Sequence, residues 1–167
     1  MYNFKFTLED KDYIEFNKFY LFKHSKRGKR DVLTVRICAF VIFASASVFF
    51  LNRNLVLFAL FLAGAVVVAL LSKWFYAKQI EKQIAKIKKE GKLPYGQKVE
   101  LSFREADFYH VSEQGESTVP YNALEAVVCG DDGSVYLFNS AMSAVIVPAR
   151  AFENPQQAQE FMDFVNR

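Results

Sequence analysis

The side chains that most often carry chemistry are few and scattered in this sequence. Two histidines, His24 and His110, and two cysteines, Cys38 and Cys129, could ligate a metal or supply a nucleophile. None of them has further ligands at the spacing that a zinc site requires. We therefore expect no catalytic residue, no metal and no cofactor, and we interpret both cysteines as small apolar packing residues.

Acidic residues give a second candidate for chemistry. The run Asp131-Asp132-Gly133 resembles the start of a calcium loop, but the later oxygen ligands and the terminal Glu are missing, so a hairpin turn is the better interpretation. No phosphate-binding glycine loop, nucleophile elbow or dinucleotide fingerprint occurs. The residue pattern therefore favours binding over catalysis, and the protein is not expected to be an enzyme.

Two apolar runs, residues 32–51 and 55–76, dominate the first half of the chain and are separated only by residues 52–54. A helix of about 20 apolar residues crosses a hydrocarbon core of about 30 Å, so each run is long enough. A pair of helices buried in a soluble core is the alternative, but neither run has a polar face. The sequence predicts a transmembrane hairpin over residues 31–76.

The charges around the hairpin predict its orientation. Residues 1–96 hold 17 Lys and Arg against 7 Asp and Glu, while the turn between the runs carries Arg53 alone. The positive-inside rule then places both termini in the cytoplasm, as a multi-pass protein of the bacterial inner membrane. Five residues are expected at the interface with the lipid head groups: Lys26, Arg27, Arg30, Trp74 and Tyr76.

Small residues at helical spacing, such as Ala65 with Ala69, are expected where the two helices touch, and could equally form the contact of a homo-oligomer. Ser45 and Ser47 could line a pore. A small oligomeric channel or carrier is therefore the alternative function, although no charged residue lies at mid-depth.

The segments that flank the hairpin are amphipathic. Residues 1–7 alternate as a half-buried strand, which we expect to join the C-terminal sheet because a lone strand is unstable. Residues 8–30 are expected to form one basic amphipathic helix with a capping box that starts at Thr7. Its aromatic residues would lie either at the membrane interface or on the soluble module. Residues 77–96 continue the second helix as a stalk and then turn.

The pattern of residues 97–167 predicts a small β-rich module. Six short strands separated by turn signals are followed by a helix that Asn154 caps and Pro155 begins. The expected fold is a membrane α+β protein, with a two-helix transmembrane hairpin and a small antiparallel β-barrel, like that of pleckstrin-homology domains, which a C-terminal helix covers. The strands are predicted at residues 98–103, 107–112, 116–120, 123–130, 134–140 and 144–149.

The chain resembles the YcxB-like family of small bacterial membrane proteins. The resemblance rests on the Phe-rich start with Thr7 and Asp10, on the basic-flanked hairpin, and on the stretches VPYNALEAVV (119–128), VYLF (135–138) and VIVPARAF (145–152). It implies a C-terminal pleckstrin-homology-like domain, but it brings no catalytic residue. Related membrane proteins with this fold are associated with envelope stress and with protection against antimicrobial peptides or toxins.

The remaining expectation concerns partners. Residues 97–167 carry 4 Lys and Arg against 11 Asp and Glu, a net charge of −7, which disfavours nucleic acid and attracts a basic protein. We expect the module to bind a protein partner, either a toxin against which it gives immunity or a membrane complex that it regulates. The candidate partner-binding residues are Glu113, Glu116, Asp131 and Asp132.

Overall fold

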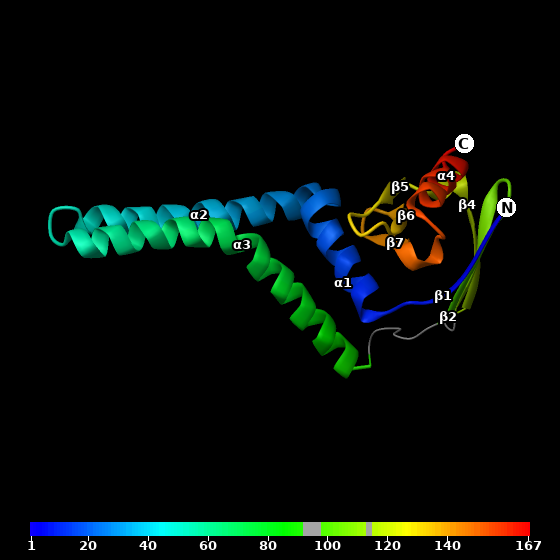
Figure 1. Cartoon of the computed structure of the whole chain (residues 1–167), viewed down its shortest axis with the longest axis horizontal. Helices are drawn as coiled ribbons and strands as arrows, with labels where there is room; N and C mark the ends of the chain where they lie inside the picture. Colours follow the sequence, from blue (N-terminus) through cyan, green and yellow to red (C-terminus); the bar gives the residue numbers. More distant parts are fainter. Residues whose placement is uncertain (92–97, 113–114) are drawn as a thin grey trace. The chain divides into compact units, whose positions relative to one another are not determined.

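The structure, a computed structural model, describes residues 1–91, 98–112 and 115–167. It separates into two compact units (Figure 1). The first unit combines residues 1–19 with residues 84–167, and the second consists of residues 20–83. The second unit is therefore an insertion into the chain of the first.

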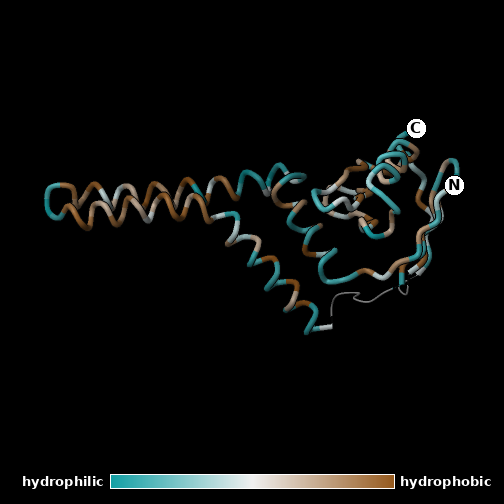
Figure 2. The backbone as a smooth tube through the Cα atoms, in the orientation of Figure 1, coloured by the Kyte–Doolittle hydropathy of each residue, from teal (hydrophilic) through white to brown (hydrophobic). Residues whose placement is uncertain are grey.

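The inserted unit is a helical hairpin. It contains the π-helix η1 (Tyr20–His24), α2 (Lys26–Phe50) and most of α3 (Leu55–Lys89), and α2 and the start of α3 run side by side (Figure 1). Asn54 caps α3, since its side chain accepts hydrogen bonds from the backbone N–H of Val56 and Leu57. Both helices are long and apolar enough to cross a membrane, and their apolar character is visible along the hairpin (Figure 2).

The contact between α2 and α3 uses small and polar side chains. Ser47 and Ala65 are buried, and Ser47 Oγ donates to Phe58 O at 3.1 Å. Nearer the basic end, Arg36 Nε donates to Ser72 Oγ at 2.8 Å. Phe61 of α3 also stacks on Phe50 of α2, with ring centroids 5.5 Å apart, while most other large apolar side chains cover the outside of the hairpin. The hairpin is therefore polar at a few points inside and apolar outside, which is the pattern that lipid requires.

The helix expected over residues 8–30 is divided, so that prediction is wrong. α1 covers Asp10–Phe19, η1 follows, and α2 starts at Lys26 because Ser25 Oγ accepts from the N–H of Gly28. Gly28 permits this junction, because a Cβ there would lie 2.8 Å from Leu21 O. The expected capping box is also displaced: Glu9, rather than Thr7, precedes α1, and its N–H donates to Asp12 Oδ2.

The first unit contains two antiparallel sheets. One sheet has the order β1-β2-β3-β4 and the other the order β5-β6-β7. β1 pairs with β2 from Tyr2 opposite Phe103 to Thr7 opposite Lys98, so the N-terminal strand enters this sheet. The bounds are β1 Tyr2–Thr7, β2 Lys98–Phe103, β3 Asp107–Ser112, β4 Gly115–Pro120, β5 Ala126–Cys129, β6 Val135–Ser140 and β7 Ser143–Val147.

These sheets do not form the closed barrel that the sequence predicted. Among the described residues, β4 pairs only with β3, and β7 pairs only with β6. The chain leaves the first sheet at Pro120, which has no N–H to donate, and passes through the 3₁₀ turn η2 (Tyr121–Ala123) before β5 begins. The ladder therefore stops at Pro120, and β4 and β7 remain as open edges.

Helix α4 (Pro155–Val165) covers the core between the sheets. As predicted, Asn154 caps it, accepting from the N–H of Gln157 at 2.8 Å. Phe161 on its buried face is in edge contact with Phe4 and Phe103, at ring distances of 5.2 and 4.7 Å. This apolar contact fixes the helix on the first sheet. A further 3₁₀ turn, η3 (Ala149–Ala151), joins β7 to the segment before α4.

Strand β6 is buried on both of its faces, which explains where α1 lies. Val135 and Leu137 point into the main core, while Tyr136 and Phe138 point to the other face. Phe16 of α1 lies 5.3 Å from the Tyr136 ring and 5.9 Å from the Phe138 ring. Phe19 also contacts Tyr136, at 4.9 Å. These aromatic residues of α1 therefore pack on the β-rich module, which resolves the two alternatives that the sequence allowed.

Candidate functional site: the cleft between β4 and β7

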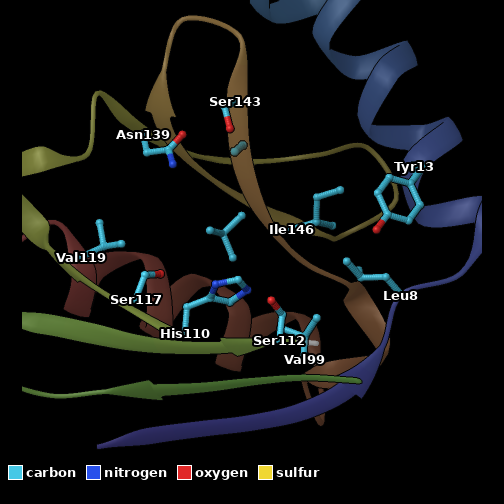
Figure 3. A pocket seen from close by; sticks show the side chains of 12 residues that line it. Leu8, Tyr13, Val99, His110, Ser112, Ser117, Val119, Asn139, Ser143 and Ile146 are labelled. Atoms are coloured by element: carbon cyan, nitrogen blue, oxygen red, sulfur yellow. The ribbon is translucent and has the colours of Figure 1, made fainter. Parts of the chain in front are cut away.

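The open edges β4 and β7 flank a cavity of about 400 Å³ (Figure 3). β4 contributes Ser117 and Val119 to its wall, and β7 contributes residues 143–146. The remaining wall comes from β2, β3, β6 and the start of α1. The full lining is Leu8, Tyr13, Val99, His110, Ser112, Ser117, Val119, Asn139, Ser143, Ala144, Val145 and Ile146. Because the two sheets do not close into a barrel, a cleft remains between β4 and β7.

The wall of this cleft carries no charge unless His110 binds a proton and becomes positive. It contains no Asp, Glu, Lys or Arg side chain among the described residues. Burial lowers the pKa of His110 from its ordinary value of 6.5, so the imidazole is neutral at pH 7. Burial and the charge of Asp12 raise the pKa of Tyr13, which keeps its hydroxyl protonated. The cleft therefore offers neutral hydrogen-bonding groups on an otherwise apolar surface.

The α1 side of the cleft is held by an ion pair that the sequence did not reveal. Asp12 is only 5% exposed, and its two carboxylate oxygens accept from Arg150 Nη1 and Nη2, both at 2.6 Å. Nη2 of Arg150 also donates to Thr7 O at 2.6 Å. Arg150 lies in η3, directly after β7 and Pro148. One guanidinium thus ties the end of β1, α1 and the β7 end of the second sheet together, next to Leu8 and Tyr13 of the cleft.

A carboxylate also orders the turn between β5 and β6. Asp132 accepts from Ser134 Oγ at 2.7 Å and from the Tyr136 hydroxyl at 3.4 Å. Burial, followed by the nearby Asp132 charge, raises the pKa of Tyr136 well above its ordinary range. Ser134 Oγ accepts in turn from the N–H of Ala149, at 3.2 Å. Both carboxylate oxygens of Asp132 therefore accept hydrogen bonds within the module, so Asp132 is less available to bind a partner than the sequence suggested.

The other partner-binding candidates occupy different places. Glu116 lies on the exposed β4 edge and accepts a hydrogen bond from the Tyr109 hydroxyl. Asp131 lies with Asp132 in the turn before β6. Glu113 lies outside the described residues. The structure thus places Glu116 on one sheet and Asp131 at the end of the other, so these acids do not form a single cluster.

The predicted interface residues fall at one end of the hairpin. Lys26, Arg27 and Arg30 form the start of α2. Trp74 and Tyr76 follow Ser72, which bonds Arg36, so the antiparallel register places them toward the same end. Trp74 is 54% exposed. These five side chains therefore lie toward the same end of the hairpin, and their place at a lipid interface stays a prediction.

The interpretation of the two cysteines as packing residues is wrong. Cys38 and Cys129 are both exposed. Cys129 ends β5 opposite Val135, and it lines a surface pocket together with Phe152 and Ala158. Partial burial and then the charges of Asp132 and Asp131 raise the pKa of the Cys129 thiol, so it is a poor nucleophile at neutral pH. No group of three or more His, Cys, Asp and Glu that could hold a metal occurs within the described ranges.

The cleft is the feature that the sequence reasoning missed. Its lining is drawn from residues far apart in the chain, from Leu8 to Ile146, and no local motif joins them. A signal was present in the four consecutive apolar residues of β6, Val135 to Phe138, because such a run indicates burial on both faces. Burial on both faces of β6 implies that another element covers its second face. If that element is α1, Tyr13 lies near the sheet.

Comparisons with known proteins bear on the β-rich module. Residues 105–165 match the family described as YcxB-like protein. The match covers β3 to α4 and confirms the resemblance over that part of the chain. Neither the curated proteins nor the solved structures contain a match to the chain.

Proposed function

Since residues 105–165 match the YcxB-like family, we propose that the chain is a multi-pass protein of the bacterial inner membrane whose cytoplasmic module binds an extended segment of a protein partner. The hairpin anchors the module, and the cleft between β4 and β7 receives the partner. The observation that carries this proposal is the position of the cleft between two unpaired strand edges.

The surface of the hairpin supports the membrane anchor. Most of the large exposed apolar side chains of the chain lie on α2 and α3. Water would disfavour such a surface strongly, at about 25 cal/mol per Å² of apolar area, whereas lipid accepts it. The basic residues at the start of α2 and at the end of α3 support a cytoplasmic location for both ends of the hairpin, by the positive-inside rule.

The strand arrangement supports a pleckstrin-homology-like module. Four strands and then three strands form two antiparallel sheets, and one C-terminal helix covers the core between them. The strands and the covering helix follow the order that the sequence predicted, but the barrel is open between β4 and β7. A fold of this kind provides a scaffold and does not identify a reaction, so the function must be argued from the cleft.

An unpaired strand edge offers a row of backbone N–H and C=O groups to another chain. β4 and β7 each present one such edge, and the cleft between them has a volume of about 400 Å³ for the side chains of an added strand. Apolar walls such as Val119 and Ile146 would hold apolar side chains, and the serines and His110 would bond polar ones. Strand addition is therefore the mode of binding that this site supports.

Charge identifies the partner's character. The module carries a net charge of −7 over residues 97–167, and Glu116 lies on the β4 edge itself. A basic segment would be attracted to this rim and would bind faster at low ionic strength. A basic toxin, against which the protein gives immunity, and a basic subunit of a regulated membrane complex both fit this description.

Site-specific photo-cross-linking in cells tests the cleft. A photoreactive residue in place of Ser143 on β7 should form an adduct with a partner, and one in place of Gln156 on the exposed side of α4 should not. Adding Ser117→Trp, which fills the cleft, should abolish the Ser143 adduct. An equal yield from Ser143 and Gln156, or an adduct that Ser117→Trp leaves unchanged, would refute binding in the cleft.

Two further measurements test the membrane part of the proposal. In a cysteine-free background, Asn52→Cys in the hairpin turn should react with a membrane-impermeant maleimide added to spheroplasts, while Met142→Cys in the module should react only after lysis. Expression should also raise survival against a co-encoded toxin if the role is immunity. The alternative function, a small channel or carrier, predicts solute flux in liposomes that contain the purified protein.

A further inference from the structure

Arg36 is a cation within an apolar helix, and no carboxylate of the described residues pairs with it. Between residues 20 and 83 the only acidic residues are Asp31 and Glu81. Asp31 pairs with Arg27 at 3.8 Å, and Glu81 pairs with Lys78 at 2.7 Å. Within the described residues, the guanidinium of Arg36 has one hydrogen bond, from Nε to Ser72 Oγ. An unneutralised guanidinium in hydrocarbon is costly, so Arg36 would be stabilised by an anion from outside the chain.

The depth of Arg36 determines which anion can reach it. If the turn after Leu51 marks one face of the hydrocarbon core, Arg36 lies about 22 Å from that face, at about 1.5 Å per residue. A core of about 30 Å then ends near Val32, about one helical turn beyond Arg36. The long side chain of an arginine spans that distance and reaches the phosphate layer of the basic end.

The register of the hairpin supports the same boundary. Arg36 lies opposite Ser72, so the antiparallel register places Trp74 and Tyr76 beyond Ser72, toward the end of the hairpin at which α2 begins. Trp and Tyr concentrate at the edge of the hydrocarbon core. The aromatic belt and the helix length thus place the edge at the same level, just beyond Arg36.

Ser72 orients the guanidinium, and Lys73 adds a second charge. The Ser72 hydroxyl donates to Ala69 O at 3.1 Å and accepts from Arg36 Nε, so both of its hydrogen-bonding roles are used and Nη1 and Nη2 remain available. Lys73, the next residue, is exposed, and no carboxylate of the described residues pairs with it. A guanidinium oriented through Nε is suited to a phosphate diester, which can accept two parallel N–H bonds from Nη1 and Nη2, and the exposed Lys73 adds positive charge on the neighbouring face of α3.

We propose that Arg36 and Lys73 bind the phosphate of an anionic phospholipid, such as phosphatidylglycerol or cardiolipin, from the leaflet at the basic end of the hairpin. The inference rests on the proposed insertion of the hairpin into a bilayer. A lipid, rather than a dissolved phosphate ion, is the ligand because the phosphate layer that the Arg36 side chain reaches consists of lipid head groups, and because Phe40 and Phe75, about one turn along their helices from Arg36 and Ser72, are exposed and would meet the acyl chains of the same lipid.

Native mass spectrometry of the full chain tests this site. Protein released from nanodiscs that contain equal amounts of phosphatidylcholine and phosphatidylglycerol should retain phosphatidylglycerol preferentially. Arg36→Gln and Lys73→Gln should each reduce that preference by about fivefold, the effect of one cation near a lipid surface. Arg53→Gln, which removes a cation at the opposite end of the hairpin, is the matched control and should retain the preference.

The outcomes separate the lipid site from the anchor. If Arg36→Gln retains phosphatidylglycerol as wild type does, if Arg53→Gln loses it equally, or if inorganic phosphate displaces the lipid, the site is refuted. Carbonate extraction of the same membranes reports insertion independently: wild type and Arg36→Gln should both stay in the pellet. Wild-type protein that is extracted by carbonate would overturn the proposed anchor, whereas inserted protein without lipid preference would overturn only the inference.

Discussion

Replacing Arg150 by methionine tests whether one guanidinium holds the N-terminal segment on the module. Arg150→Met leaves the Asp12 carboxylate buried, with the N–H of Glu9 as its remaining hydrogen bond. Removing one partner of a buried ion pair costs about 3–5 kcal/mol. Because 40% of the Arg150 side chain is exposed, solvent already screens part of the interaction, and we expect a loss of about 2–3 kcal/mol.

The reverse change should cost less. Asp12→Ala leaves a guanidinium that can turn toward water, so we expect a loss of about 1–2 kcal/mol. In the double variant neither charge is left unpaired, and the free energy of unfolding should be higher than in Arg150→Met alone. The pair is thus expected to be strongly non-additive, as contacting residues in a shared network usually are.

Pulse proteolysis of the full chain in mild detergent over a urea series measures these differences, since the protease cleaves the unfolded module. Lys5→Met, which removes the exposed ion pair with Glu100, is a matched control and should change the free energy of unfolding by no more than about 0.5 kcal/mol. The reasoning is refuted if Arg150→Met is equally neutral, or if the two single losses add in the double variant.

Two further predictions concern the cleft and the β5–β6 turn. Burial lowers the pKa of His110 below 6.5, so His110 binds a proton more readily in the unfolded chain than in the folded one. The free energy of unfolding should therefore fall as the pH drops below 6.5. His110→Gln should weaken this pH dependence, measured by urea unfolding between about pH 7.5 and about pH 5.5. An unchanged slope would show that His110 does not contribute. Gly130→Ala should destabilise the module by about 1–3 kcal/mol, because the new Cβ would lie 2.7 Å from Asp132 Oδ1 and 2.8 Å from Tyr136 Cε2. Unchanged urea unfolding of this variant would contradict the packing at the turn.

Local sequence signals predicted most of the elements. The two apolar runs became α2 and α3, the alternating segments became strands, and Asn154 with Pro155 started α4. Each of these depends on residues within one turn or one strand, where periodicity and capping chemistry act directly. The break between residues 8 and 30 was also encoded locally, by Ser25 and Gly28, but the basic run across them resembled a continuing helix.

Long-range features could not be predicted in the same way. Asp12 and Arg150 are 138 residues apart, and nothing in either neighbourhood indicates the other. The barrel was expected to close, but closure depends on whether β4 reaches β7, which is decided by the 3₁₀ turn after Pro120 and by packing of the whole core. The cleft is a consequence of that open side, so it could not be derived before the sheet order was known.

The pairing of β1 with β2 also constrains how the protein assembles. Thr7 lies opposite Lys98, so the strand pair closes a loop of about 90 residues that contains the whole hairpin. Such a non-local contact forms slowly from a disordered chain. A folded hairpin reduces the cost, because its two ends return together; within the first unit, Lys88 of α3 donates to Asp10 of α1 at 2.6 Å. Folding of the hairpin should therefore precede completion of the first sheet.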